Sequence, residues 1–286
     1  MKKRSQLKRR SPLTDHPLRN PGQSLDEEID RLINDKGILW IAAISVSLLQ
    51  FLMEWWRWYT NPTPNPTAVA IVIIPTISFS LYRLFHIVKQ VKRLRMARDG
   101  EKAVGQFLAD LREKGYRIFH DILGDEFNID HIIISDRGIF TVETKTYSKP
   151  TAGRPEVHFD GKTLLVNGYP PYRDPITQAQ AQAAWSKRIL KESTGKEYPV
   201  KAVIVFPGWF VQSTHSRNQN VPWVLNPKAL PAFINNAPSK LQPADVQLAA
   251  YHYVALYPHQ TTVMTGQPPA CRGDLRSRIL QMNKPF

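Results

Sequence analysis

The sequence predicts an α/β domain, a mixed sheet flanked by helices, preceded by a two-helix transmembrane hairpin. Two observations predict the hairpin: two long stretches without a charged residue, and a proline-rich segment between them. A third predicts the domain, because short runs rich in β-branched residues alternate with helical patterns after Arg98. The chain has 286 residues, enough for such a domain and a core of its own.

The hairpin is expected over residues 37–88. Its first uncharged stretch is GILWIAAISVSLLQFLM, which starts at Gly37 and is followed by the aromatic cluster EWWRWY. The second has an apolar part that starts near Ala68 and is interrupted by Pro75. Each is close to the roughly 20 residues that span a hydrocarbon core, and TNPTPNPT between them is a turn that no helix can cross. Two buried helices of a soluble protein are the alternative.

Basic residues lie on both outer flanks of the hairpin. Residues 1–98 hold 16 Lys and Arg against 7 Asp and Glu. Positive flanks stay in the cytoplasm, so we expect the protein in the cell (inner) membrane, with both termini cytoplasmic and residues 1–36 as a basic cytoplasmic segment. These residues also attract anionic lipid head groups. The net charge of +14 therefore belongs mostly to the flanks and does not by itself indicate nucleic-acid binding.

The domain is expected to start with a helix in RDGEKAVGQFLADLREKGY, which has Val104, Leu108 and Leu111 on one face and Gly115 as its stop. Three strands, a β-hairpin, a helix with Asp174 as N-cap, and a nearly all-apolar interior strand follow. In order they are YRIFHDI, NIDHIIIS, GIFTVETKT, EVHFDGKTLLVNG, DPITQAQAQAAWSKRILKES and VKAVIVFPG. Residues 209–260 are expected to be a helical extension, and residues 261–286 a tail.

Residues 128–146, NIDHIIISDRGIFTVETKT, place carboxylates in two neighbouring strands. If a two- or four-residue loop closes this hairpin, Asp130 faces Glu143 and alternation puts Lys145 on the same side. Facing carboxylates are destabilising unless a positive charge lies between them, which favours a divalent metal there. A three-residue loop with a bulge would instead pair Asp130 with Thr144 and turn Glu143 to the other face.

Glu101 is a further candidate for the same site, and the histidines and the cysteine are candidates for different chemistry. Glu101 falls along the edge of the helix face that packs on the sheet, so it can supply a third carboxylate, although a glutamate in a first helical turn also simply favours the helix dipole. His131 alternates with Asp130 onto the opposite face, which argues against a histidine metal site with His120. The single cysteine, Cys271, excludes an intrachain disulfide. The sequence contains neither a G-x-S-x-G elbow nor a phosphate-binding P-loop.

The motifs GEKAVGQFL, NIDHIIIS, GIFTVETKT and DPITQAQ, in this order, resemble the nuclease-related domain (NERD) family of the PD-(D/E)xK nuclease superfamily. The resemblance covers about residues 98–208. It implies a restriction-endonuclease-like α-β-β-β-α-β core with Glu101 from the first helix, Asp130 from the second strand and Glu143-x-Lys145 from the third. Gln178 matches a glutamine that the family often carries. The sequence departs from the motif in having no proline before Asp130.

The chemistry that follows is metal-dependent hydrolysis. Asp130, Glu143, Glu101 and the backbone carbonyl of Thr144 would hold Mg²⁺ or Mn²⁺ through hard oxygen ligands. Such a metal polarises a phosphodiester and activates water, while Lys145 would orient or deprotonate that water and offset charge on phosphorus.

The expected function is that of a membrane-anchored, Mg²⁺-dependent phosphodiesterase, an endo- or exodeoxyribonuclease. Its partners would be nucleic acid, DNA in particular, and the lipid membrane. The alternative is a catalytically inactive nucleic-acid-binding or membrane-scaffold module that retains the fold. Basic residues that could contact the phosphate backbone are Lys102, Arg137, Lys149, Arg154 and Arg173.

Overall fold

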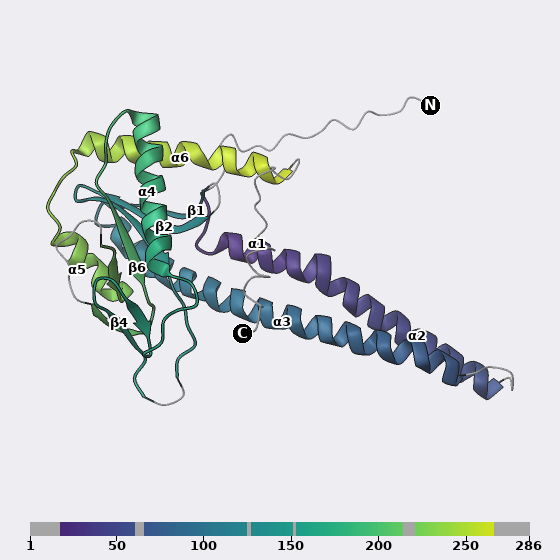
Figure 1. Ribbon diagram of the computed structural model, residues 1–286. Helices are drawn as coiled ribbons and strands as arrows, with labels where there is room; N and C mark the ends of the chain where they lie inside the picture. The colour runs from purple at the N-terminus through teal and green to yellow at the C-terminus, as the bar shows by residue number, and fades with distance from the viewer. Residues whose placement is uncertain (1–17, 61–65, 125–126, 151–152, 214–220, 266–286) are drawn as a thin grey trace, which may run out of the picture. The chain divides into compact units, whose positions relative to one another are not determined.

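The computed structural model describes residues 18–60, 66–124, 127–150, 153–213 and 221–265 (Figure 1). The chain divides into two compact units. The helical unit comprises residues 22–103 and 146–148, and the sheet unit comprises residues up to 21, 104–145 and 149 onward. The fold is mixed α/β, with strands and flanking helices in the sheet unit, as predicted.

Long helices make up the helical unit. They are α1 (Gln23–Arg31), the π-helical turn η1 (Leu32–Gly37), α2 (Ile38–Thr60) and α3 (Pro66–Arg112), whose last turns belong to the sheet unit. Gly22 begins α1 at φ 70°, and a Cβ there would meet the backbone and side chain of Arg98 on α3, so glycine is needed. Ile29 and Leu32 pack against Ile87 and Val91 of α3 and form the core of this unit.

Two helical stretches, Gln23–Thr60 and Val69–Arg112, are long and apolar enough to span a membrane. Only 11% and 17% of their most apolar windows are buried, whereas the core helix of a soluble protein is mostly buried. Helix α2 ends at Thr60 and α3 begins at Pro66, and residues 61–65 of the predicted proline-rich turn lie outside the described part of the chain. Length and composition carry no information on orientation, which stays a prediction.

The predicted interruption at Pro75 is wrong. Helix α3 continues through Pro75, and the helix expected to start at Arg98 is the end of the same helix. One proline removes a single amide donor, and neighbouring hydroxyls can relieve the disturbance.

The main sheet has five strands in the order β1-β2-β3-β6-β8. They are β1 (Arg117–Leu123), β2 (Asn128–Ser135), β3 (Gly138–Thr144), β6 (Val200–Val205) and β8 (Trp223–Leu225). Strands β1 and β3 each run antiparallel to β2, which lies between them, and β3, β6 and β8 are parallel. The nearly all-apolar strand β6 is an interior strand, as predicted, and every residue of β3 is buried.

A smaller sheet has the order β5-β4-β7, with β4 (Glu156–Phe159), β5 (Leu164–Val166) and β7 (Phe210–Ser213). The remaining helices are α4 (Pro175–Thr194), the 3₁₀ turn η2 (Pro227–Ala229), α5 (Leu230–Asn235) and α6 (Pro243–Thr265). The predicted helical extension, residues 209–260, therefore also contains two strands, which are too short to show a strand period in the sequence. Helix α6 enters the predicted tail, and residues 266–286 lie outside the described part.

Helices cover both faces of the main sheet. On one face, Ile132 and Ile134 pack with Trp185 and Leu190 of α4 and Tyr253 of α6; Figure 1 shows α4 lying along the strands. On the other, residues such as Ile133 pack with the end of α3 and with α5. Asp174 caps α4 by accepting from the Ile176 amide, as predicted. The ends of β2 and β3 are thereby held under the first turns of α4.

Candidate active site

The β2–β3 hairpin has one defined register. Ile134 pairs with Ile139, and Ser135 pairs with Gly138 across the two-residue loop Asp136-Arg137, so the bulged alternative is wrong. Gly138 has φ 134°, and a Cβ there would lie 3.0 Å from the Pro199 carbonyl oxygen, which favours this tight closure by glycine.

The hairpin ladder ends before it reaches the two carboxylates. Its last Cα pair is His131 with Val142, and beyond it the Asp130 carboxylate accepts a hydrogen bond from the Thr144 amide at 2.6 Å. The Asp130 carboxylate thus takes the place of a backbone acceptor for the Thr144 amide, beside Glu143 and Lys145. The predicted direct pairing of Asp130 with Glu143 is not among the ladder pairs.

Glu143 is buried and has three side-chain donors. Its Oε1 accepts from Lys145 Nζ and from Gln178 Nε2, both at 2.7 Å. Lys145 Nζ also donates to Gln178 Oε1 at 2.8 Å. Glu143, Lys145 and Gln178 therefore form a closed triangle of hydrogen bonds. The predicted placement of Glu143 and Lys145 on one face is confirmed.

Sequence reasoning missed a fourth member, Gln182. Its Nε2 donates to Glu143 Oε2 and to the Asn128 carbonyl oxygen, and the residue is fully buried. Gln178 and Gln182 stand one helical turn apart on α4, whereas Gln180 between them is exposed. The i, i+4 spacing within QAQAQA was the signal that could have found it.

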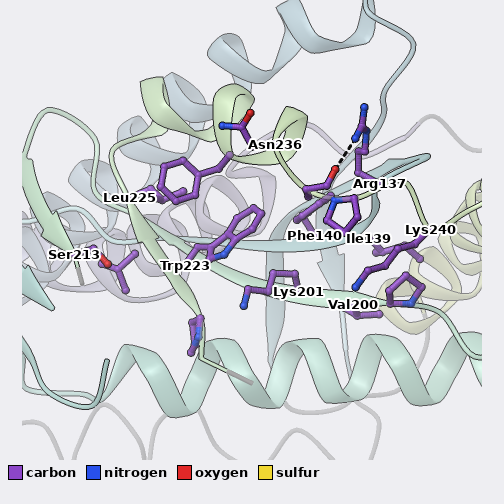
Figure 2. Close-up of a pocket in the computed structure, with 16 residues that line it drawn as sticks. Arg137, Ile139, Phe140, Val200, Lys201, Ser213, Trp223, Leu225, Asn236 and Lys240 are labelled. Atoms are coloured by element: carbon purple, nitrogen blue, oxygen red, sulfur yellow. Dashed lines mark hydrogen bonds between the residues drawn. The ribbon is translucent and has the colours of Figure 1, made fainter. Parts of the chain in front are cut away.

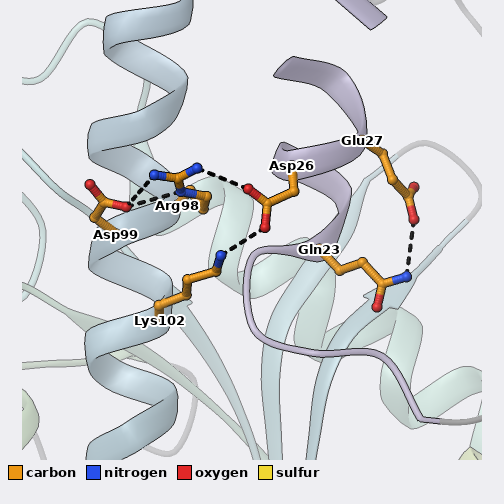
Figure 3. Close-up of polar contacts among 6 residues, drawn as sticks. All are labelled: Gln23, Asp26, Glu27, Arg98, Asp99 and Lys102. Atoms are coloured by element: carbon orange, nitrogen blue, oxygen red, sulfur yellow. Dashed lines mark hydrogen bonds and ion pairs between the residues drawn. The ribbon is translucent and has the colours of Figure 1, made fainter. Parts of the chain in front are cut away.

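Glu101 belongs to the helical unit, where it is buried in α3. Its predicted role beside Asp130 and Glu143 stays a prediction. Its neighbour Lys102 donates to Asp26 Oδ2 at 2.7 Å, and Arg98 binds the other oxygen of Asp26 (Figure 3). Burial raises the pKa of Asp26, but these hydrogen bonds outweigh it and leave that pKa lowered. Lys102, a candidate phosphate contact, is thus already in an ion pair on the helical unit.

Two other candidate phosphate contacts have partners as well. The Arg154 guanidinium lies 3.5 Å from the centroid of the Phe210 ring. Arg137 Nη1 donates to the Ala237 carbonyl oxygen at 2.6 Å.

A metal at this site would be bound by oxygen atoms. The described residues contain no cluster of three or more His, Cys, Asp or Glu that could hold one, so a metal would rely on Asp130, Glu143 and the Thr144 carbonyl. These are the hard oxygen ligands that Mg²⁺ and Mn²⁺ prefer. Within the described ranges, buried Gln182 Oε1 and Thr144 Oγ1 also have no hydrogen-bond partner. Oxygen lone pairs are therefore available, and the donor chemistry fits a hard divalent cation.

His120 and His131 form a separate buried pair. Their Nδ1 atoms are 2.8 Å apart, so one ring must donate and the other accept. Burial, and then the nearby charge of Arg112, lowers the pKa of His120 to about 4. Burial and His120 lower the pKa of His131 well below its usual value. Both rings are neutral near pH 7.

Comparison with known proteins connects this geometry to a family. Residues 97–207 match the nuclease-related domain, NERD. The NERD match confirms the resemblance inferred from the four motifs, and it covers less than half of the chain. It contains the whole Asp130–Glu143–Lys145 hairpin and the helix that carries Gln178 and Gln182.

The alignment with one curated relative covers only a small part of each chain. The chain is 43% identical over 53 residues to an uncharacterized protein of Bacillus anthracis. The alignment covers 17% of this chain and 25% of that protein, so the chain spans about a quarter of the relative's length. No solved structure matches the chain.

Proposed function

We propose that the protein is a membrane-anchored, metal-dependent nuclease that hydrolyses phosphodiester bonds in DNA. The observation that carries the proposal is the buried Glu143 carboxylate, bound by Lys145 and by two glutamines of α4, beside the Asp130 carboxylate. The NERD match supports a nuclease-related function at the level of the domain. The exposed apolar helices α2 and α3 support the anchor.

The roles of the residues follow from their contacts. Asp130, Glu143 and the Thr144 carbonyl would hold Mg²⁺ or Mn²⁺, which when bound supplies Lewis acidity toward the phosphodiester. Lys145 is held between Glu143 and Gln178 and is still 19% exposed, so its ammonium can reach water and substrate. In that position it would orient the attacking water and stabilise charge that develops on the phosphoryl oxygens.

One feature favours the second candidate, an inactive nucleic-acid-binding module. Both oxygens of Glu143 already accept hydrogen bonds from protein side chains. A carboxylate satisfied in this way can serve structure alone. The two candidates differ in what Lys145 does, and a single substitution distinguishes them.

The test uses the full-length chain in detergent with a labelled DNA duplex. Wild type should cleave with Mg²⁺ and not with chelator. Lys145→Ala should slow single-turnover cleavage by roughly 10²–10³-fold, the typical loss when one preorganised donor to the transition state is removed, and should change DNA affinity only a few-fold. Lys162→Ala, in the exposed turn between β4 and β5, is the matched control and should leave both quantities unchanged.

Absence of metal-dependent cleavage by wild type on DNA would support the inactive module instead. Cleavage of RNA but not of DNA would show that the substrate is RNA. Full activity in Lys145→Ala would overturn the assigned role of Lys145 even if the protein is a nuclease.

A further inference from the structure

A cavity of about 560 Å³ opens at the end of the main sheet where the parallel strands begin (Figure 2). This size is within the range of small-molecule sites. Its lining includes Phe140 near the start of β3, Lys201 near the start of β6, and Trp223 at the start of β8. Glu143 lies at the opposite end of β3, opposite Ile204 rather than Lys201 in the β3–β6 ladder. The cavity is therefore separate from the candidate active site.

One wall of the cavity is aromatic. The Trp223 ring stacks on Phe140 with centroids 5.5 Å apart and an interplanar angle of 27°. Phe233 of α5 meets Trp223 edge-on at 5.4 Å. Trp223 and Phe233 remain only partly buried, so they can offer apolar surface to a planar ligand. Aromatic rings favour offset-stacked and edge-to-face contacts with other rings, so this wall suits a planar ring.

The other wall is cationic. Lys201 and Lys240 both line the cavity, and the sixteen described residues that line it include no carboxylate. Lys201 Nζ donates to the Val221 carbonyl oxygen at 2.7 Å and lies 5.5 Å from the centroid of the Trp223 ring. Burial, and then the charge of Lys240, lowers the pKa of Lys201. The repulsion between these two ammonium groups is the kind of cost that a bound anion removes.

Arg137 adds rigidity to this wall. Its guanidinium is held by the Ala237 carbonyl oxygen and by Asp136, whose carboxylate lies 3.3 Å from Arg137 Nε. Asp136 offsets much of the Arg137 charge. Lys201 and Lys240 contribute the two ammonium groups among the described lining residues.

We propose that this cavity binds a small phosphorylated ring compound, with a nucleoside monophosphate as the simplest example. The ring packs against Trp223 and Phe233, and the phosphate lies between Lys201 and Lys240. A phosphate monoester carries about −1.5 to −2 charges at pH 7, which matches two ammonium groups. The proposal goes beyond the nuclease assignment and shares no residue with it.

Calorimetric titration of the full-length chain with deoxyadenosine monophosphate tests the proposal. Chelator is present throughout, so that no metal-dependent turnover interferes. Inorganic phosphate and deoxyadenosine, titrated separately, should each bind at least about tenfold more weakly, since each engages only one wall. Lys201→Met and Lys240→Met should each weaken binding of the nucleotide by about tenfold or more, because each removes a charge-assisted contact. Lys162→Met and Glu143→Gln are controls that should bind as wild type does.

No binding of the nucleotide to wild type at millimolar concentration would overturn the proposal. So would loss of binding in Glu143→Gln with binding retained in Lys201→Met, because the ligand would then occupy the candidate active site. Photo-crosslinking of wild type with 8-azido-deoxyadenosine monophosphate gives a second measurement that needs no variant to fold. Labelling is expected on the peptide that contains Trp223, and labelling only elsewhere would contradict the site.

Discussion

Gln182 is the residue that ties Glu143 to the helix above it. It donates to both Glu143 and the Asn128 carbonyl oxygen, so one amide holds the end of β3 and the start of β2 together. Gln178 one turn earlier binds Glu143 and Lys145, which leaves the carboxylate with a single orientation. The two amides add no charge of their own, so Lys145 is the cation that these contacts place on Glu143.

Replacing this amide should therefore affect stability and activity together. We expect Gln182→Leu to lower the free energy of unfolding by about 1–3 kcal/mol, because a buried carbonyl and a carboxylate oxygen lose their donor. Cleavage should slow while DNA affinity is kept. Chemical denaturation and single-turnover kinetics measure the two effects. Gln180→Leu, on the exposed side of the same helix, is the control, and equal effects of both variants would show that the Gln182 contacts contribute nothing specific.

The His120–His131 pair should make the sheet unit sensitive to acid. An unfolded histidine takes up a proton near pH 6.5, whereas His120 in the folded chain does so only near its lowered pKa of about 4. The contribution of neutral His120 to the free energy of unfolding is therefore fully present above about pH 6.5. It is lost as the pH falls toward 4, by roughly 3 kcal/mol. Chemical denaturation at several pH values between 7 and 4 measures the slope of the free energy of unfolding against pH. His120→Gln should flatten it, and His158→Gln, exposed on β4, should not.

At the scale of the element, the β2–β3 hairpin carries both carboxylates and ends in a side-chain hydrogen bond instead of a ladder pair. An asparagine at position 130 can still accept from the Thr144 amide but supplies no charge to a cation. Asp130→Asn therefore separates a structural role of this side chain from metal binding.

We expect Mg²⁺ at ten times its dissociation constant to stabilise wild type by about 1.4 kcal/mol, or roughly 3–6 °C in melting temperature. Asp130→Asn should remove this response while its metal-free melting temperature stays close to that of wild type. Asp110→Asn, exposed on α3, should respond as wild type does. Melting curves with Mg²⁺ and with chelator provide the measurement, and a surviving response in Asp130→Asn would remove this residue from the ligand set.

At the scale of the whole molecule, local patterns predicted most of the fold. Apolar β-branched runs and turn residues identified the strands of the main sheet as far as β6, and Asp174-Pro175 identified the start of α4. Strand β8 escaped prediction because three residues show no period and its partner β6 is distant in the chain. The hairpin register needed the structure, because both loop types are compatible with Ser-Asp-Arg-Gly. Gln182 was missed because its partner lies on another element.

The predicted membrane topology is tested on the full chain with Cys271→Ala as background. Thr63→Cys lies between the two apolar helices, and Lys162→Cys lies in the sheet unit. An impermeant maleimide should label Thr63→Cys in intact cells and should label Lys162→Cys only after lysis. The reverse pattern would invert the orientation, and labelling of both only after lysis, with the protein in the soluble fraction, would remove the anchor.

The mixed character of the main sheet distributes the entropy of loop closure unevenly. The antiparallel pairing of β2 with β3 closes a loop of two residues, whereas the parallel pairing of β3 with β6 closes a loop that contains β4, β5 and α4. Because the entropic cost of closure rises with loop length, ordering β6 beside β3 costs more than forming the hairpin. The two carboxylates are thus carried by the part of the sheet that is least costly to order, while the chain segment with the largest closure cost also brings α4 and its glutamines to them.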